Sequence, residues 1–272
     1  IIILLSGSFI VVVLLDKDVK TAINFAVFAA FIGAIAGLMV LLHYWKKLKP
    51  TFNLNLQQGI SPAEKQPLSD IYKEILKYSI PIVFVGLANP LFQAIDMITF
   101  NRTMTSIGLA KVTDTYFTML NFLTHKIAII PVMLATGFSA ALIPTITEYF
   151  TLRKYNALRN AMDKTYQVLL FITVPAAVGI MILSPFIYHV LYEQSDMGTA
   201  VLAHYAPVAI LFALFSVTAS LLQGIDYQKW IIFSLLTGVL TKLVLNIPLI
   251  KWLQVDGAIL ATAIGYGVTI TI

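Results

Sequence analysis

The sequence predicts an all-α fold, a polytopic bundle of transmembrane helices. Charged residues make up 11% of the 272 positions and apolar residues 59%, whereas soluble domains carry about 25% charged residues. The mean hydropathy is +0.87. Several apolar windows also reach the ~20 residues that an α-helix needs to cross the hydrocarbon core of a bilayer. The chain is therefore expected to be an integral membrane protein with several spans.

Apolar windows predict about six complete spans and two partial ones. In chain order the windows cover residues 1–15 (partial), 22–42, 78–100, 116–147, 165–192, 200–225, 230–250 and 256–272 (partial). The windows that begin at 116 and 165 exceed one crossing, so we expect these helices to tilt, to kink at Pro131 and Pro175, or to extend past the bilayer surface.

The two ends of the sequence lie inside apolar runs. Nothing basic precedes residues 1–15 and no small-residue cleavage site follows them, so we expect this segment to be the tail of a spanning helix and not a signal peptide. We therefore expect the chain to be an internal fragment of a longer membrane protein.

Loops rich in lysine and arginine alternate along the chain with loops that contain few of them. This bias sets which loops face the cytoplasm. The 46–77 and 148–164 loops are the rich ones, and both are predicted to be cytoplasmic. The residues assigned to this side are Lys46, Lys47, Lys49, Lys65, Lys73, Lys77, Arg153, Lys154, Arg159, Lys164 and Lys229; those of the opposite side are Lys17, Lys20, Arg102, Lys111 and Lys251. A nucleic-acid-binding protein would instead gather them on one continuous face, so no nucleic acid is expected as a partner.

The segment 46–77 is the longest polar stretch and is rich in helix breakers, including Pro50, Gly59, Pro62 and Pro67. Such a composition is typical of a linker. It divides the chain into a first bundle (1–45), a cytoplasmic linker (46–77) and a second bundle (78–272). An ordinary long cytoplasmic loop is the alternative.

Few ionisable residues interrupt the apolar windows, and each costs about 3 kcal/mol at the centre of a helix unless it finds a polar partner or a watery cavity. Lys126 is the first candidate for a substrate-binding residue, because a cation that faces a central cavity could hold an anionic phosphate by charge-assisted hydrogen bonds. Snorkelling to the headgroups, or a structural pair, is the alternative. The neighbouring His125 could relay protons or simply pack.

Three further polar residues are candidates for the same cavity. Asp96 could pair with Lys126 or take up a proton, or it could lie hydrated near the outer end of its helix beside Asn101 and Arg102. Lys242 and Asn246 are spaced i, i+4, which places them on one face of a helix. That face could line the cavity, or the two side chains could bond to neighbouring helices.

Enzyme chemistry is not expected. The sequence lacks cysteine, which excludes thiolate metal sites and cysteine nucleophiles. It also contains no HExxH, GxSxG or Walker motif. We predict no catalytic residues, no cofactor and no metal site.

Four segments carry a resemblance to a known family: YSIPIVFVGLANPLFQAIDMITFNR (78–102), KIAIIPVMLATGFSAALIP (126–144), LLQGID (221–226) and NIPLIKWLQVDGA (246–258). They resemble the polysaccharide-biosynthesis branch of the multidrug/oligosaccharidyl-lipid/polysaccharide exporter (MOP) superfamily. Within it, the chain is similar to the group of stage V sporulation protein B and YtgP, which are relatives of the MurJ-type lipid II flippases.

This resemblance implies a fold and a function. The MOP flippase fold has two transmembrane lobes, so the chain would run from the end of the first lobe, through the interlobe linker, into an incomplete second lobe. The resemblance implies a bacterial cell-membrane flippase of lipid-linked diphosphate saccharides, such as lipid II-like cell-wall precursors, that works by alternating access. Either an ion gradient, with Na⁺ or H⁺ as the coupling ion, or the membrane potential would drive transport, and the sequence does not say which. Lys126 occupies what resembles the position of a cavity cation that is commonly arginine in these proteins.

Two other functions are also compatible with the sequence. A multidrug or cation antiporter of the same superfamily would use acidic cavity residues, for which Asp96 is the one candidate. A membrane scaffold in cell division or sporulation would use its intramembrane charges only to hold helices together.

Overall fold

A computed structural model describes residues 19–58, 67–192 and 194–272. Within these ranges the chain forms helices and no β-strand, which confirms the predicted all-α fold. The chain divides into two compact units, residues 1–66 and residues 67–272. The predicted partial span at 1–15 lies outside the described residues.

The described part of the first unit is a single helix, α2 (Val19–Gln58). It contains the predicted span 22–42 and then continues through Pro50, so the first part of the predicted linker is helical. Leucine, lysine and glutamine, which are good helix formers, dominate the sequence around this proline. The unit boundary after residue 66 falls inside the predicted linker, and the assignment of two lobes stays a prediction.

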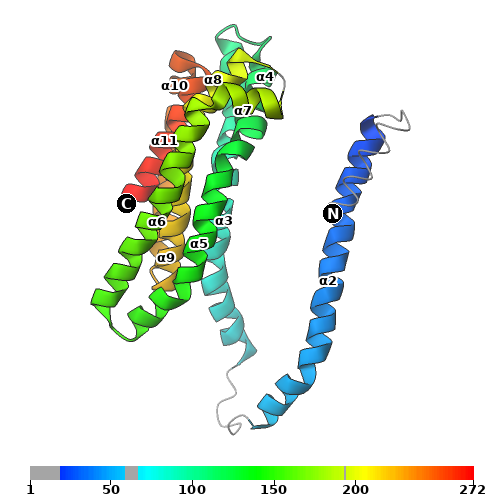
Figure 1. Ribbon diagram of the computed structural model, residues 1–272, viewed down its shortest axis with the longest axis vertical. Helices are drawn as coiled ribbons and strands as arrows, with labels where there is room; N and C mark the ends of the chain where they lie inside the picture. Colours follow the sequence, from blue (N-terminus) through cyan, green and yellow to red (C-terminus); the bar gives the residue numbers. More distant parts are fainter. Residues whose placement is uncertain (1–18, 59–66, 193) are drawn as a thin grey trace. The chain divides into compact units, whose positions relative to one another are not determined.

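The second unit contains the remaining helices (Figure 1). They are α3 (Leu68–Ser106), α4 (Thr113–Thr118), the π-helix η1 (Met119–Thr124), α5 (His125–Thr151), α6 (Tyr155–Ile182), α7 (Ser184–Leu191), α8 (Asp196–Tyr205), α9 (Val208–Gly224), α10 (Gln228–Leu253) and α11 (Val255–Thr271).

Six helical stretches among the described residues are long and apolar enough to cross a membrane. They are Phe31–Pro50, Leu68–Ser106, Thr113–Thr151, Tyr155–Ile182, Asp196–Gly224 and Gln228–Leu253, and the shorter apolar helix Val255–Thr271 follows them. The chain is a multi-pass membrane protein.

Two predicted windows are divided in the structure. The window 165–192 is split where α6 ends at Ile182 and α7 starts just before Pro185, a position near a helix start that suits proline because its missing N–H needs no partner there. The window 200–225 is split between α8 and α9 at Pro207, whose ring removes one backbone hydrogen bond. By contrast, α5 and α6 continue through Pro131 and Pro175.

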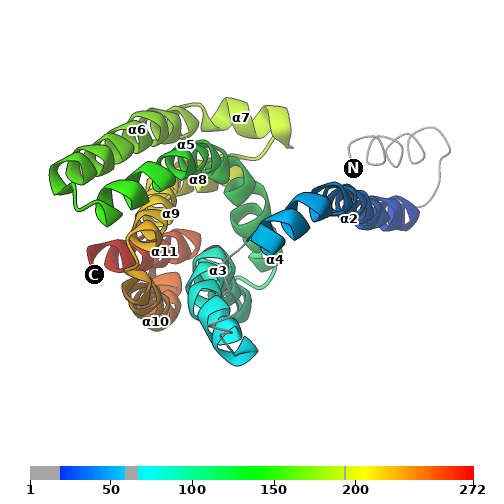
Figure 2. The same cartoon turned by 90° about the horizontal axis from the view of Figure 1, so that it is seen from below.

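The second unit is layered, as Figure 2 shows from below: α6 and α7 form one side, α5, α8 and α9 the middle, and α11, α10 and α3 the other side. The main packing pairs are α10 with α11, α5 with α6, α10 with α3, and α5 with α9. The α10–α11 contact is close because of a glycine. A Cβ added at Gly238 would lie 1.8 Å from Thr269 Oγ1 and 2.5 Å from the Gly265 carbonyl oxygen, so small residues let these two backbones approach.

The connections of the second unit gather at its two ends (Figure 1). The start of α3, the α5–α6 turn and the α9–α10 turn lie at one end, whereas the α3–α4 connection and the α10–α11 turn lie at the other. The end that holds the α5–α6 and α9–α10 turns is called the basic end below, because Lys73, Lys77, Arg153, Lys154 and Lys229 all lie near it.

Candidate functional site

A polar network lies inside the second unit where α3, α10 and α11 meet. Its centre is the Lys242 side chain on α10, which is 1% exposed. The Lys242 Nζ donates hydrogen bonds to Asp96 Oδ2 on α3 at 2.7 Å, to the Phe92 carbonyl oxygen at 2.9 Å and to Thr262 Oγ1 on α11 at 2.9 Å. An ammonium group has three hydrogens to donate, so all of them are used.

Asn246 extends this network by one helical turn. Its Nδ2 donates to Asp96 Oδ1 at 3.0 Å and to Thr99 Oγ1 at 2.7 Å. Each carboxylate oxygen of Asp96 therefore accepts a hydrogen bond from α10. The sequence prediction that Lys242 and Asn246 share one face is confirmed, and that face is bonded to the neighbouring helices α3 and α11.

The chemistry of this arrangement is that of a closed, neutralised pair. Burying an ion costs several kcal/mol, and only a close partner together with further hydrogen bonds offsets that cost. The 2.7 Å Lys242–Asp96 pair meets both conditions. A carboxylate, a carbonyl and a hydroxyl oxygen are ligands that a hard cation also takes, and here the Lys242 ammonium is the cation that they hold. The described residues contain no group of three or more His, Cys, Asp or Glu side chains that could bind a metal ion.

His125, the first residue of α5, packs in an aromatic group that reaches the Phe92 ring of this network through Phe212 and Tyr266. Its Nδ1 lies 2.8 Å from the Tyr205 hydroxyl of α8. The ring also makes edge contacts with the rings of Tyr205 and Phe212, at centroid distances of 6.0 and 5.6 Å. This geometry is that of a hydrogen-bonded packing residue, and the proton-relay role stays a prediction.

Lys126 differs from its neighbour because consecutive residues of a helix point about 100° apart. His125 is half-buried, whereas Lys126 is exposed. Among the described residues Lys126 has no hydrogen-bond or ion-pair partner. The exposed positions Ile130, Met133, Gly137 and Ala141 follow it at helical spacing, so Lys126 begins a stripe on α5 that is otherwise uncharged.

A π-helix precedes these two residues, and the sequence analysis did not predict it. In η1 the Leu123 carbonyl oxygen accepts a hydrogen bond from the Tyr192 hydroxyl at 3.1 Å. Asn121 Nδ2 and Thr124 Oγ1 are buried there without a partner among the described residues. Short π-helical segments are rare and are frequent at functional sites, and this one immediately precedes His125 and Lys126.

The structure corrects the pairing expected for Asp96. This carboxylate binds Lys242 and not Lys126, and it is 4% exposed, so it is not hydrated beside Asn101 and Arg102. Asn101 instead donates to Asp114 at 3.1 Å. Sequence reasoning missed the Thr99 and Thr262 hydroxyls; the spacing of Thr99 three residues after Asp96 was the available signal.

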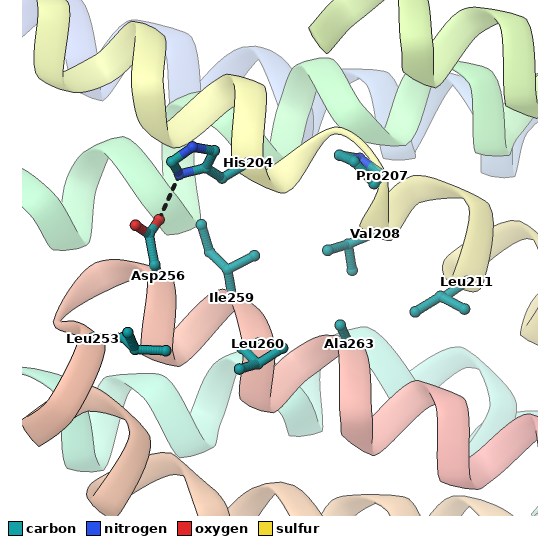
Figure 3. Close-up of a pocket in the computed structure, with 9 residues that line it drawn as sticks. All are labelled: His204, Pro207, Val208, Leu211, Leu253, Asp256, Ile259, Leu260 and Ala263. Carbon is teal, nitrogen blue, oxygen red and sulfur yellow. Dashed lines mark hydrogen bonds and ion pairs between the residues drawn. The ribbon is translucent and has the colours of Figure 1, made fainter.

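An apolar cavity of about 410 Å³ lies elsewhere, between α8, α9 and α11 (Figure 3). At its edge, His204 Nδ1 and Asp256 Oδ1 are 2.7 Å apart. The His204 side chain is 58% exposed and the Asp256 side chain 50%. Leu211, Ile259 and Ala263 are among the residues that face the space in Figure 3. None of the five predicted site residues lines this cavity.

Comparison with known proteins gives a family and relatives. A family model described as "Polysaccharide biosynthesis protein" matches residues 1–150. The chain is 44% identical over 270 residues to a Bacillus subtilis (strain 168) protein named "Lipid II flippase MurJ", covering 98% of this chain and 49% of that relative. It is 24% identical to the uncharacterized membrane protein YabM of the same organism, covering 86% of this chain and 43% of the relative.

A third relative comes from another organism. The chain is 24% identical to an uncharacterized membrane protein of Methanocaldococcus jannaschii, covering 87% of this chain and 52% of the relative. The chain thus spans about half the length of the curated relatives it matches. No solved structure matches it.

Proposed function

Because the chain belongs to the polysaccharide biosynthesis protein family, we propose that it forms part of a flippase that moves a lipid-linked diphosphate saccharide across the bacterial cell membrane. The 44% identity to a protein named as a lipid II flippase supports a lipid II-like cell-wall precursor as the substrate class. The activity is transport by alternating access and not catalysis. The saccharide and diphosphate pass through a cavity while the lipid tail stays in the bilayer.

The exposed cation Lys126 is the observation that supports a substrate contact in this chain. Its ammonium is not engaged by any described residue, so its three donors are available for the diphosphate oxygens. A charge-assisted hydrogen bond of this kind is worth about 1.5–3 kcal/mol. The small residues after it, Gly137 and Ala141, leave room for the substrate or the first lobe to approach α5 closely.

The buried pair is assigned a different role. Lys242 cannot donate to a substrate while it keeps its bonds to Asp96, Phe92 and Thr262. Releasing it would leave an unpaired carboxylate in the interior, which costs several kcal/mol. We therefore assign Asp96, Lys242 and Asn246 to the rigid support of the transport site.

The same geometry bears on whether Asp96 takes part in ion coupling. A Na⁺- or H⁺-coupled site needs a carboxylate that can exchange its cation, and the Asp96 carboxylate already holds the tethered ammonium of Lys242. We propose that this site binds neither Na⁺ nor H⁺ during transport. The cation-antiporter alternative relied on Asp96 as its acidic residue. Because Asp96 is paired with Lys242, that alternative has no acidic candidate left among the predicted site residues.

The orientation in the membrane is part of the proposal. The segments 46–77 and 148–164 face the cytoplasm by the positive-inside rule, although their described residues are largely helical extensions of α2, α3, α5 and α6 and not loops. The clustering of the α5–α6 turn, the α9–α10 turn and the start of α3 at the basic end supports this assignment for the second unit (Figure 1).

The test is a flipping assay with the full-length protein in proteoliposomes, using a fluorescent lipid-linked diphosphate saccharide. Lys126→Ala is expected to lower the flipping rate at least tenfold, whereas Lys126→Arg, which keeps the charge, retains most of it. Lys111→Ala is the matched control, because Lys111 is also an exposed lysine of the second unit but lies in the α3–α4 connection.

Three outcomes would contradict the proposal. They are normal flipping by Lys126→Ala, a loss in Lys126→Arg as severe as in Lys126→Ala, and an equal loss in the Lys111→Ala control. Absence of flipping by the wild-type protein would favour the scaffold.

A further inference from the structure

A second cavity lies at the basic end, between α3 and the α9–α10 turn, and has a volume of about 460 Å³. Its walls include Lys77 and Pro81 of α3, Asp226 and Tyr227 of the turn, and Lys229 and Trp230 of α10. It contains none of the candidate residues described above and lies on different helices from the Lys126 stripe. The transport proposal therefore leaves this cavity without a role.

Its charge is positive. Two lysines line it from different helices, Lys77 on α3 and Lys229 on α10, and Asp226 carries the one carboxylate among the described lining residues. Lys229 is exposed and has no hydrogen-bond or ion-pair partner in the described part of the chain. Lys229 is the second residue of α10. The partial positive charge at the start of this helix adds to the positive potential in the cavity. An anion is the ligand that this charge favours.

Aromatic side chains place the cavity at the membrane surface. Tyr227 and Trp230 are 51% and 56% exposed although both are large and amphipathic. Tyrosine and tryptophan gather where the hydrocarbon core meets the headgroups. Trp230 also contacts the exposed ring of Phe233 one turn further into α10, at a centroid distance of 6.3 Å. An apolar surface thus continues from the cavity along α10.

The cavity therefore combines two features that a lipid headgroup requires together. Lysines can bind the phosphate, and the exposed Trp230 and Phe233 rings can contact the glycerol and the first part of an acyl chain. A soluble phosphate would use only the first feature. Basic pockets between transmembrane helices at the cytoplasmic surface bind anionic lipid headgroups for this reason.

We propose that this cavity is a binding site for the phosphate headgroup of an anionic phospholipid in the leaflet next to the α9–α10 turn. Lys229 and Lys77 bind the headgroup from two helices, and Tyr227 and Trp230 hold its upper acyl region. The lipid connects α3 to α10 at the basic end, on the same two helices that the Asp96–Lys242 pair connects deeper in the unit.

The experiment uses the full-length protein, delipidated in detergent and titrated with phosphatidylglycerol while native mass spectrometry counts the bound lipids. Lys229→Gln is expected to weaken binding of the tightest phosphatidylglycerol about fivefold or more, the equivalent of one lysine contact near a membrane surface. Lys229→Arg is expected to keep it. Lys251→Gln is the matched control, because Lys251 is also exposed but lies at the opposite end of α10.

Several results would overturn the proposal. Equal weakening by Lys229→Gln and Lys251→Gln would show a general charge effect, and no weakening by Lys229→Gln would remove the site. Phosphatidylcholine that binds as tightly as phosphatidylglycerol would show adherence by apolar contacts alone. Displacement of the lipid by millimolar inorganic phosphate would assign the cavity to a soluble anion.

The lipid proposal and the transport proposal can fail separately. Lipid binding is measured without a transported substrate, and Lys126→Ala is expected to leave it unchanged. An unfolding midpoint recorded for each variant separates loss of the site from loss of the fold, and Lys77→Gln offers a second variant on α3.

Discussion

Lys242 and Lys126 are the same residue type in two apolar helices, and the structure gives them opposite environments. Lys242 is 1% exposed and donates three hydrogen bonds. Lys126 is exposed and is bonded to none of the described residues. The difference arises from what faces each of them, since α10 packs between α3 and α11, whereas the Lys126 side of α5 meets no helix of the described second unit.

Structural and functional charges inside a membrane differ in whether the surrounding helices satisfy them. A charged residue that the surrounding helices satisfy completely stabilises their packing and is unavailable to a ligand. A charged residue left unsatisfied in an apolar segment is expected to serve a transported molecule or a cavity.

The largest effect is expected for Lys242→Met. The change removes the ammonium and leaves the Asp96 carboxylate buried without a counter-charge, which typically costs 3–5 kcal/mol. The measurement is the free energy of unfolding in detergent micelles. Lys126→Met is the matched control and is expected to change that free energy by about 0.5 kcal/mol or less, because the side chain is exposed and has no described partner.

A double variant sharpens the same comparison. Asp96→Asn combined with Lys242→Met removes both charges, so it is expected to be more stable than Lys242→Met alone by about 2 kcal/mol. An equal loss of stability in Lys126→Met and Lys242→Met, or a double variant no more stable than the single one, would contradict the structural role of the pair.

A smaller effect is expected where α10 meets α11. Gly238→Ala places a methyl group against Thr269 and the Gly265 backbone, and overpacking of this kind costs about 1–3 kcal/mol. Gly137→Ala on the exposed side of α5 meets nothing within 4 Å, so it is expected to stabilise the helix by up to about 1 kcal/mol. Thermal unfolding of the two variants compares them, and a Gly238→Ala protein as stable as Gly137→Ala would contradict the close α10–α11 contact.

The sequence predicts most of the helical spans because apolar length is a strong local signal. It does not predict the divisions at Leu183 and Pro207 or the helix through Pro50, since a proline can begin, interrupt or continue a helix according to its neighbours. The π-helix before His125 is also not predicted, because no residue pattern in the sequence marks where the backbone changes from α-helical to π-helical hydrogen bonding.

The candidate site was predictable in composition but not in arrangement. The i, i+4 spacing correctly placed Lys242 and Asn246 on one face of a helix. Their partner Asp96 lies 146 residues before Lys242, and a single sequence contains no signal for a contact at that distance. The sequence left Asp96 with three alternatives, namely a pair with Lys126, proton uptake or a hydrated place at the helix end, and a pair with Lys242 was not among them. Which of the two lysines is left for a ligand could be read only from the packing of α3, α10 and α11.

The most direct measurement is the dissociation constant of a lipid-linked diphosphate saccharide for the full-length protein, compared between wild type and Lys126→Ala. The loss of one charge-assisted hydrogen bond predicts binding at least tenfold weaker, with an unfolding midpoint equal to that of the wild type. Unchanged affinity in a folded Lys126→Ala protein would contradict the assignment of Lys126 to the substrate.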